Sequence, residues 1–194
     1  DDTTGDAFIK SLEKTGVRVN IHQVDNGITG ECLVLITPDH ERTMYTHLGV
    51  SSQLNIEDIN QGVIKDSEYL LVEGYLVTSE ETMNVASYSI DFATKHGVKK
   101  IITLSDPNVV KFFRDNILEL LNKTFDIIFC NKQEALNVSK SNNIDDAIDF
   151  LKKYAREIIV TCGEDGAYVT NGSEKFHEIP DSVKPVDLTG AGDM

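Results

Sequence analysis

The residues of this chain that are most able to do chemistry lie near its end, at 187–193. Gly190, Ala191 and Gly192 leave room for an anion such as a phosphoryl group to approach the main chain, and the free N–H groups at the start of a helix carry partial positive charge. Asp193 follows at the start of the predicted helix, where it could accept a proton from a hydroxyl that attacks the phosphoryl group. A glycine-rich turn without function is the alternative that this heptapeptide alone leaves open.

Asn131 and Glu134 form a second candidate pair. They open a predicted helix and, three positions apart, lie on the same face of it. An amide and a carboxylate there could hold water around Mg²⁺, which prefers oxygen ligands and keeps several waters. A simple helix cap at Asn131, with Glu134 complementing the helix dipole, is the alternative, and the two residues taken by themselves favour it.

Thr161, Gly163 and Gly166 form a third candidate site, where a predicted strand ends in a turn. The threonine hydroxyl and the N–H groups of the glycine turn could meet the phosphates of a nucleotide. Taken alone, the three residues indicate only a tight turn.

The composition limits the classes of function. The 194 residues are 40% hydrophobic and can bury one sizeable core. A net charge of -14 argues against unspecific nucleic-acid binding, so a polyphosphate would be held locally by backbone dipoles, a metal or a few cations. Cys32, Cys130 and Cys162 are too few and too scattered for a disulfide framework. With no membrane-length apolar run and no signal peptide, we expect a cytoplasmic protein without a membrane partner.

Alternating strands and helices must position these residues. After a short helix at 6–15, the segment 17–48 predicts hairpin strands in a small, mostly antiparallel sheet. Beyond it, the predicted strands are 68–76, 100–104, 126–130, 157–162, 166–170 and 175–179, and the predicted helices are 56–64, 78–96, 106–122, 132–138 and 145–156. We expect Asn55 to cap the helix 56–64. We expect Thr78 and Glu81 to form a capping box at the start of the helix 78–96, and Gly97 to end this helix.

Continuous apolar strands that alternate with amphipathic helices indicate an α/β fold with a mostly parallel sheet covered on both faces. Ligands of such sheets bind beyond the carboxyl ends of the strands. This rule selects the segments 105–106, 131–134 and 163–166.

Taken together and in this order, the three motifs resemble the ribokinase-like (PfkB) family of carbohydrate and nucleoside kinases. The resemblance rests on Asn131-x-x-Glu134, on Thr161-x-Gly163-x-x-Gly166 and on the segment 187–193, and it runs across the whole chain. It implies a three-layer α/β/α, Rossmann-like fold with a small β-sheet lid. We expect residues 1–16 and 49–194 to form the core, residues 17–48 to form the lid, and the chain to be an internal part of a longer protein.

The resemblance also implies a role for each site residue. Asp193 corresponds to the catalytic base, and the anion hole corresponds to Gly190, Ala191 and Gly192. Asn131 and Glu134 correspond to the Mg²⁺ and phosphate network, and the contacts to nucleotide phosphates correspond to Thr161, Gly163 and Gly166. Asp187 and Thr189 match a monovalent-cation site, for which K⁺ is the candidate ion. Arg42 in the lid could close on the transferred phosphate, and a solvated charge at a strand end is the alternative.

Within the family, the segments 41–44, 48–49, 73–76 and 105–107 look most like the bacterial adenosine-kinase-like branch. We therefore expect transfer of the γ-phosphate of ATP to a primary hydroxyl of a ribose-containing small molecule, with adenosine as the first candidate. The alternatives are a sugar kinase of the ribokinase or fructokinase type and a non-catalytic nucleoside-binding module. A monomer and a homodimer joined through the lid both remain open.

Overall fold

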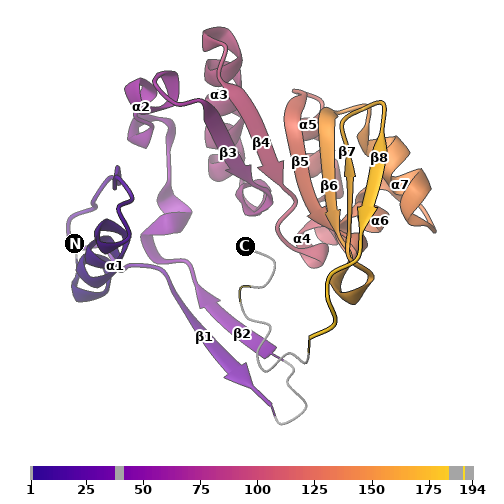
Figure 1. The fold of residues 1–194 in the computed structure, drawn as a ribbon. Coiled ribbons are helices and arrows are strands. Elements are labelled where there is room, and N and C mark those ends of the chain that lie inside the picture. The colour runs from indigo at the N-terminus through magenta and orange to yellow at the C-terminus, as the bar shows by residue number, and fades with distance from the viewer. Residues whose placement is uncertain (1, 38–41, 184–189, 191–194) are drawn as a thin grey trace. The chain divides into compact units, whose positions relative to one another are not determined.

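The computed structural model describes residues 2–37, 42–183 and 190, and the side chain of Arg42 is not described. The chain divides into two compact units, Asp1–Asn60 and Gln61–Met194, which we describe separately (Figure 1). The finer prediction of a lid at 17–48 stays a prediction.

The described residues of the first unit form one α-helix and one β-hairpin. Its helix α1 (Thr3–Lys14) begins after Asp2, whose carboxylate accepts hydrogen bonds from the N–H of Gly5 at 2.7 Å and from the N–H and hydroxyl of Thr29 at 2.7 and 2.8 Å. β1 (Glu31–Ile36) pairs antiparallel with β2 (Arg42–His47), and two 3₁₀ turns follow, η1 (Gly49–Gln53) and η2 (Ile56–Asp58). Asn55 is a cap, as predicted, but the predicted helix 56–64 is wrong: the capped element is only the 3₁₀ turn η2, the chain is extended at Ile59, and a separate helix α2 (Gln61–Lys65) follows.

The prediction of strands throughout 17–48 is only partly right. Residues 17–30 form no strand, although Val19 and Ile21 have strand-like spacing. A strand exists only when a neighbour pairs with its backbone N–H and C=O groups. Among the described residues of this segment, such a neighbour is found only where the hairpin pairs β1 with β2.

The second unit is built on a six-stranded sheet with the order β3-β4-β5-β6-β7-β8. Its strands are β3 (Tyr69–Glu73), β4 (Lys99–Thr103), β5 (Phe125–Asn131), β6 (Ala155–Thr161), β7 (Ala167–Thr170) and β8 (Lys175–Glu178). The first four run parallel and the last two are antiparallel, so the predicted mostly parallel sheet is confirmed. The helices are α2 (Gln61–Lys65), α3 (Glu80–His96), α4 (Pro107–Phe112), α5 (Arg114–Leu121), α6 (Lys132–Ser139) and α7 (Ile144–Leu151), with 3₁₀ turns η3 (Gly74–Thr78) and η4 (Gly163–Asp165).

The core of this unit lies between the helices and one face of the sheet. Because the four parallel strands follow one another in chain order and such crossovers are right-handed, their connecting helices lie on the same side. Alternate strand residues pack there against α3, α5, α6 and α7; they include Val72, Ile102, Ile128, Cys130, Ile158 and Val160. The sequence predicted helices on both faces of the sheet. In the described part of the chain, helices cover one face only.

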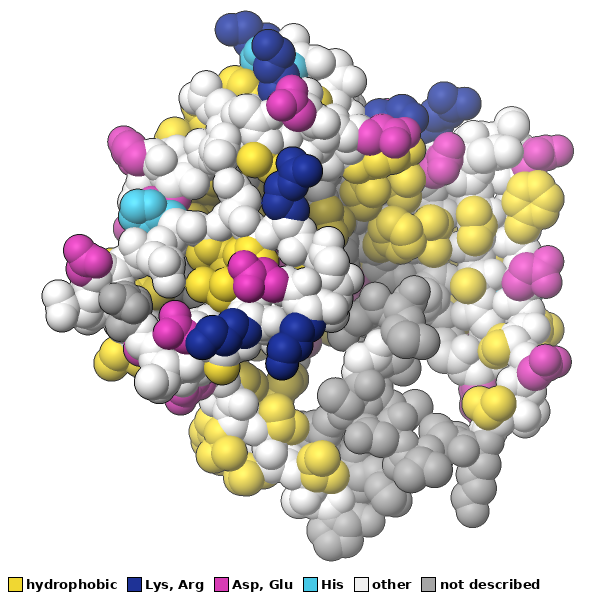
Figure 2. Space-filling view, turned by 60° about the vertical axis from the view of Figure 1, so that its left-hand side comes forward, with side chains coloured by type: hydrophobic (Ala, Val, Ile, Leu, Met, Phe, Trp, Pro, Cys, Tyr) yellow, Lys and Arg dark blue, Asp and Glu magenta, His cyan; other side chains and the backbone are white. Residues whose placement is uncertain are grey.

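The opposite face of the sheet is apolar and open to solvent in the described residues. Its register brings together Leu71, Ile101, Ile127, Phe129, Ile159, Val169 and Phe176. Leu71, Phe129, Val169 and Phe176 are exposed, and Figure 2 shows hydrophobic side chains gathered on the molecular surface. No helix among the described residues is long and apolar enough to cross a membrane.

Three further predicted helices need correction. α3 is capped by Ser79, whose hydroxyl accepts the N–H of Thr82 at 3.2 Å, so the predicted capping box at Thr78 is wrong; the Thr78 hydroxyl donates instead to the carbonyl of Tyr75. The predicted helix 106–122 breaks at Phe113 into α4 and α5. α7 ends at Leu151 rather than near residue 156, because Ala155 already pairs with Phe125 in the sheet.

Candidate active site

The carboxyl ends of the four parallel strands meet at one edge of the sheet. β5 and β6 end there with Asn131 and Thr161, which are register partners in neighbouring strands. Glu134 lies in the first turn of α6 directly after β5, and the turn that contains Gly163 and Gly166 follows β6. The structure therefore brings two of the three predicted motifs to the same edge.

Asn131 and Glu134 form a closed pair of reciprocal hydrogen bonds. The Asn131 side-chain oxygen accepts the Glu134 N–H at 2.9 Å, and Glu134 Oε2 accepts the Asn131 N–H at 2.9 Å. Glu134 Oε1 also accepts a bond from Asn131 Nδ2 at 2.7 Å. This is a capping box, so the cap that the two residues favoured by themselves is present. It also fixes the orientation of the carboxylate at the strand end.

Glu134 is an unusual residue for its position, because only 3% of it is exposed. Burial raises the pKa of its carboxyl, the hydrogen bond from the Asn131 N–H lowers it, and the negative charge of Asp106 raises it further, with a net upward shift. Asp106 caps α4 at the end of the neighbouring β4. The edge thus carries two carboxylates from adjacent strands that interact electrostatically.

The carboxylate of Glu134 could hold a divalent cation through intervening water molecules. Each of its two oxygens accepts one hydrogen bond from Asn131, and a carboxylate offers about four acceptor positions, so both oxygens keep capacity for water. Within the described residues, no three His, Cys, Asp or Glu side chains come together as a direct metal site. Water-mediated binding is also the mode that the sequence predicted for Mg²⁺ here.

The turn after β6 depends on its glycines. Gly163 and Gly166 have φ of 59° and 89°, a conformation that favours glycine. A Cβ on Gly166 would overlap the carbonyl oxygen of Glu178, whereas the space around Gly163 is open. Thr161 is exposed, and its hydroxyl makes no hydrogen bond within the described residues. An open glycine and an unbound hydroxyl at a strand end are suited to contact an anion.

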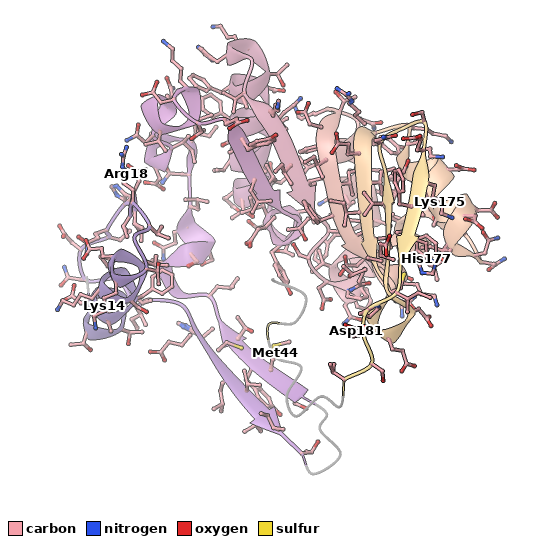
Figure 3. All side chains as sticks on the ribbon, in the orientation of Figure 1. Lys14, Arg18, Met44, Lys175, His177 and Asp181 are labelled. Atoms are coloured by element: carbon pink, nitrogen blue, oxygen red, sulfur yellow. The ribbon has the colours of Figure 1, made fainter. Side chains whose placement is uncertain are left out.

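An ion pair that the sequence did not reveal joins the second and third motif segments. Lys132 Nζ, at the start of α6, lies 3.0 Å from Asp165 Oδ2 in η4. The hydrogen bond to Asp165 and its charge raise the pKa of Lys132. Both side chains are largely exposed, so the pair contributes little stability. His177, labelled on β8 in Figure 3, holds the same turn: its Nε2 lies 2.7 Å from the Asp165 carbonyl oxygen.

Most of the glycine turn at 187–193 lies outside the described residues. Gly190 alone is described, half-buried and with φ of 75°, which favours glycine. The other predicted site residues of this segment lie outside the description; they are Asp187, Thr189, Ala191, Gly192 and Asp193. Arg42 begins β2 in the first unit, and its backbone is the register partner of Ile36.

The fold and the two motifs agree with a known family. The model of the pfkB family of carbohydrate kinases matches residues 1–194, and the chain belongs to this family.

Individual relatives include nucleoside and sugar kinases. An adenosine kinase from Dictyostelium discoideum is 28% identical over 206 residues, which cover 94% of this chain and 58% of the relative. A ribokinase from Staphylococcus aureus (strain COL) is 25% identical over 172 residues, which cover 85% of this chain and 53% of the relative. The crystal structure of adenosine kinase from Sinorhizobium meliloti matches with a TM-score of 0.92 and 32% identity, over 100% of this chain and 60% of that one.

The structural match confirms the predicted ribokinase-like fold. The chain spans between 53% and 60% of the length of these three relatives. The reaction of the intact protein is therefore a matter for proposal.

Proposed function

We propose that the intact protein is an ATP-dependent phosphotransferase that moves the γ-phosphate to a primary hydroxyl of a ribose-containing small molecule, with adenosine as the first candidate. One observation carries this proposal: the capping box of Asn131 and Glu134 and the turn after Thr161 lie at the same edge of the sheet. In a parallel sheet, this is the edge where ligands bind.

Asp193 is the proposed base of the reaction. A carboxyl with an ordinary pKa of about 3.9 is ionised at neutral pH but cannot fully deprotonate an alcohol in the ground state. It acts late, because the attacking oxygen becomes acidic only as its bond to phosphorus forms. Asp193 thus orients the hydroxyl first and takes the proton at the end.

The developing charge on the transferred group needs fixed donors. The backbone N–H groups of Gly190, Ala191 and Gly192 are the proposed anion hole, and the loss of one such donor typically lowers the rate by about a hundredfold or more. A bound Mg²⁺ would offset negative charge on the phosphates of the nucleotide. Glu134 and Asn131 would hold it through water, and a K⁺ site at Asp187 and Thr189 is part of the same proposal.

The choice of adenosine rests on similarity. The adenosine kinases from D. discoideum and S. meliloti are 28% and 32% identical to this chain. The S. aureus ribokinase, at 25%, favours a free sugar as the second candidate. A ribokinase II from E. coli with the same fold was crystallised with ATP and Mg²⁺, which supports both as ligands of the family fold.

The experiment compares the intact wild type with Asp193→Asn for ADP release in the presence of adenosine, inosine, guanosine, ribose and fructose. Asp181→Asn is the matched control, because Asp181 is an exposed aspartate outside the motif (Figure 3). We expect Asp193→Asn to lower kcat by about 10²- to 10⁴-fold, as the loss of a general base does, and Asp181→Asn to leave it unchanged.

Each alternative has a distinct outcome in this assay. Full turnover by Asp193→Asn would remove the role of Asp193, and a preference of the wild type for ribose or fructose would replace the nucleoside by a sugar. Calorimetric binding of adenosine without any transfer would favour a non-catalytic module.

The segment 17–48 is the proposed lid, which would exclude water that otherwise competes for the phosphoryl group. Arg42 would approach the transferred phosphate from this lid. Sedimentation of the intact protein would distinguish a monomer from a homodimer joined through the lid strands.

A further inference from the structure

Ser105 lies two residues beyond the end of β4 in a left-handed backbone conformation, with φ of 70°. Residues with a Cβ rarely adopt this conformation, because Cβ comes too close to the following carbonyl oxygen. A glycine would adopt it without strain. Strained residues persist where the surroundings require them, so the contacts of the Ser105 hydroxyl decide whether it has a task.

The hydroxyl of Ser105 joins the ends of two strands. It accepts a hydrogen bond from the N–H of Gly74 at 2.8 Å, one residue beyond the last register pair of β3 and β4, Glu73 and Thr103. The two chain segments are close here, because a Cβ on Gly74 would come within 2.6 Å of the carbonyl oxygen of Leu104. The bond thus extends the contact between the strands to the binding edge of the sheet.

The turn at Ser105 also directs Asp106. The Asp106 N–H reaches back to the carbonyl of Leu104 at 2.9 Å, and Asp106 Oδ1 accepts the N–H groups of Asn108 and Val109 at 2.7 and 3.2 Å. The other oxygen, Oδ2, makes no hydrogen bond within the described residues. Asp106 therefore begins α4 and keeps one carboxylate oxygen available at the edge where Glu134 lies.

We propose that Ser105 is a positioning residue of the phosphotransferase site. Through its bond to Gly74 and its left-handed backbone, it holds the Asp106 carboxylate and the first turn of α4 beside Asn131 and Glu134. This inference rests on the proposed function, because it assigns Ser105 to the edge at which the phosphoryl group is transferred.

Ser105→Gly tests the hydroxyl apart from the backbone. Glycine keeps the left-handed conformation and relieves its strain, so the melting temperature stays close to that of the wild type while the Gly74 amide exchanges its hydrogen faster. We expect kcat to fall by about tenfold to a hundredfold, as small displacements of a site do, and KM for ATP to change by less than about twofold.

Lys140→Gly is the matched control. Lys140 has the same left-handed conformation, with φ of 57°, at the end of α6, and it has no part in the proposed site. Its replacement relieves comparable strain and should leave kcat unchanged. Ser105→Asn is the rescue variant, because asparagine tolerates the left-handed conformation and its side-chain oxygen can accept the Gly74 N–H. We expect it to recover part of the lost kcat.

Two results would overturn the inference alone. One is a kcat of Ser105→Gly that stays within about twofold of that of an active wild type, since the hydroxyl would then matter only for structure. The other is unchanged exchange of the Gly74 amide in that variant, since the hydrogen bond would then be absent. A wild type that transfers phosphate to none of the acceptors would overturn the proposed function as well, and this failure is seen without any variant.

Discussion

The two units of the chain differ sharply in how they bury apolar side chains. The second unit, 61–194, contains every buried hydrophobic residue of the described chain, and most of them form one contiguous cluster. None of the described residues of the first unit, 1–60, is buried. Its hairpin exposes apolar side chains on both faces, among them Leu33 and Tyr45 on one and Val34 and Met44 on the other.

This difference shows that the two units are stabilised by different interactions. A two-stranded hairpin is at best marginally stable in water without a packing partner. The described polar contacts of the first unit include the bonds of Asp2 to Gly5 and Thr29 and the capping box of Asn55. The second unit has a hydrophobic core that dominates its stability. Substitutions of the same kind should therefore have different effects in the two units.

The largest effect is expected for Ile128→Ala in the second unit. Ile128 is 0% exposed and lies in the middle of β5. The shortened side chain loses its transfer free energy and leaves a cavity, so we expect the free energy of unfolding to fall by about 2–5 kcal/mol. Urea unfolding followed by circular dichroism measures it. A loss below about 1 kcal/mol would mean that the core can collapse around the cavity.

Glu134→Gln should have a smaller effect on stability. The amide keeps one acceptor oxygen, so one of the two Asn131 donors loses its partner, which costs about 1–2 kcal/mol. The pKa of Glu134 is raised in the folded state, so wild-type stability falls as pH rises from 4.5 through the folded pKa. The variant lacks this dependence, and the difference between the two proteins should be smaller at pH 8 than at pH 5.

The measurement is urea unfolding of wild type and variant at both pH values, with Gln133→Ala as control for an exposed residue of the same helix. A difference that grows with pH would contradict the buried carboxyl as its source. A fall in kcat beyond the loss of folded protein would support the role of Glu134 in the proposed reaction.

Asp2→Asn should loosen only the first unit. Hydrogen bonds from the Thr29 N–H, the Gly5 N–H and the Thr29 hydroxyl lower the pKa of Asp2 to about 2. The stabilisation by its carboxylate is therefore complete above pH 3.8 and is lost as pH falls toward 2. Hydrogen exchange of the Gly5 and Thr29 amides should be faster in the variant at neutral pH, and its rates should lack the wild-type change in this acidic range. Equal protection in both proteins would contradict the role of Asp2.

Much of the second unit could be predicted because its signals are local. Apolar runs such as 127–130 and 158–160 predicted buried parallel strands, and Gly97 predicted the end of α3, where it has φ of 72°. The Asn131 and Glu134 spacing predicted a helix cap at Asn131, since both partners lie within one helical turn; the reciprocal bond from the Asn131 N–H to Glu134 was not predicted. The carboxyl ends of parallel strands lie at one edge of the sheet, so the sequence also predicted that Asn131 and the turn after β6 lie at the same edge.

The remaining features depend on partners that are distant in the sequence. Ser105 has a left-handed backbone conformation, and its hydroxyl accepts a hydrogen bond from the N–H of Gly74. The residues next to Ser105 in the sequence predict neither feature. The break at Phe113 lies next to Arg114, whose Nε donates to the carbonyl of Val138. The ion pair of Lys132 with Asp165 joins residues 33 positions apart. Tertiary contacts of this kind override local propensity.

Ile28→Ala is the matched counterpart of Ile128→Ala and should have the smallest effect. Ile28 is 62% exposed in the first unit, and its backbone carbonyl accepts the Val50 N–H at 2.9 Å, a bond that survives the substitution. Little apolar surface leaves water on folding, so we expect a change of less than about 0.5 kcal/mol. Urea unfolding of Ile28→Ala and Ile128→Ala in the same buffer gives the ratio of their losses in the free energy of unfolding. If the two losses were equal, Ile28 would be packed in solution, and the contrast between the units would fail.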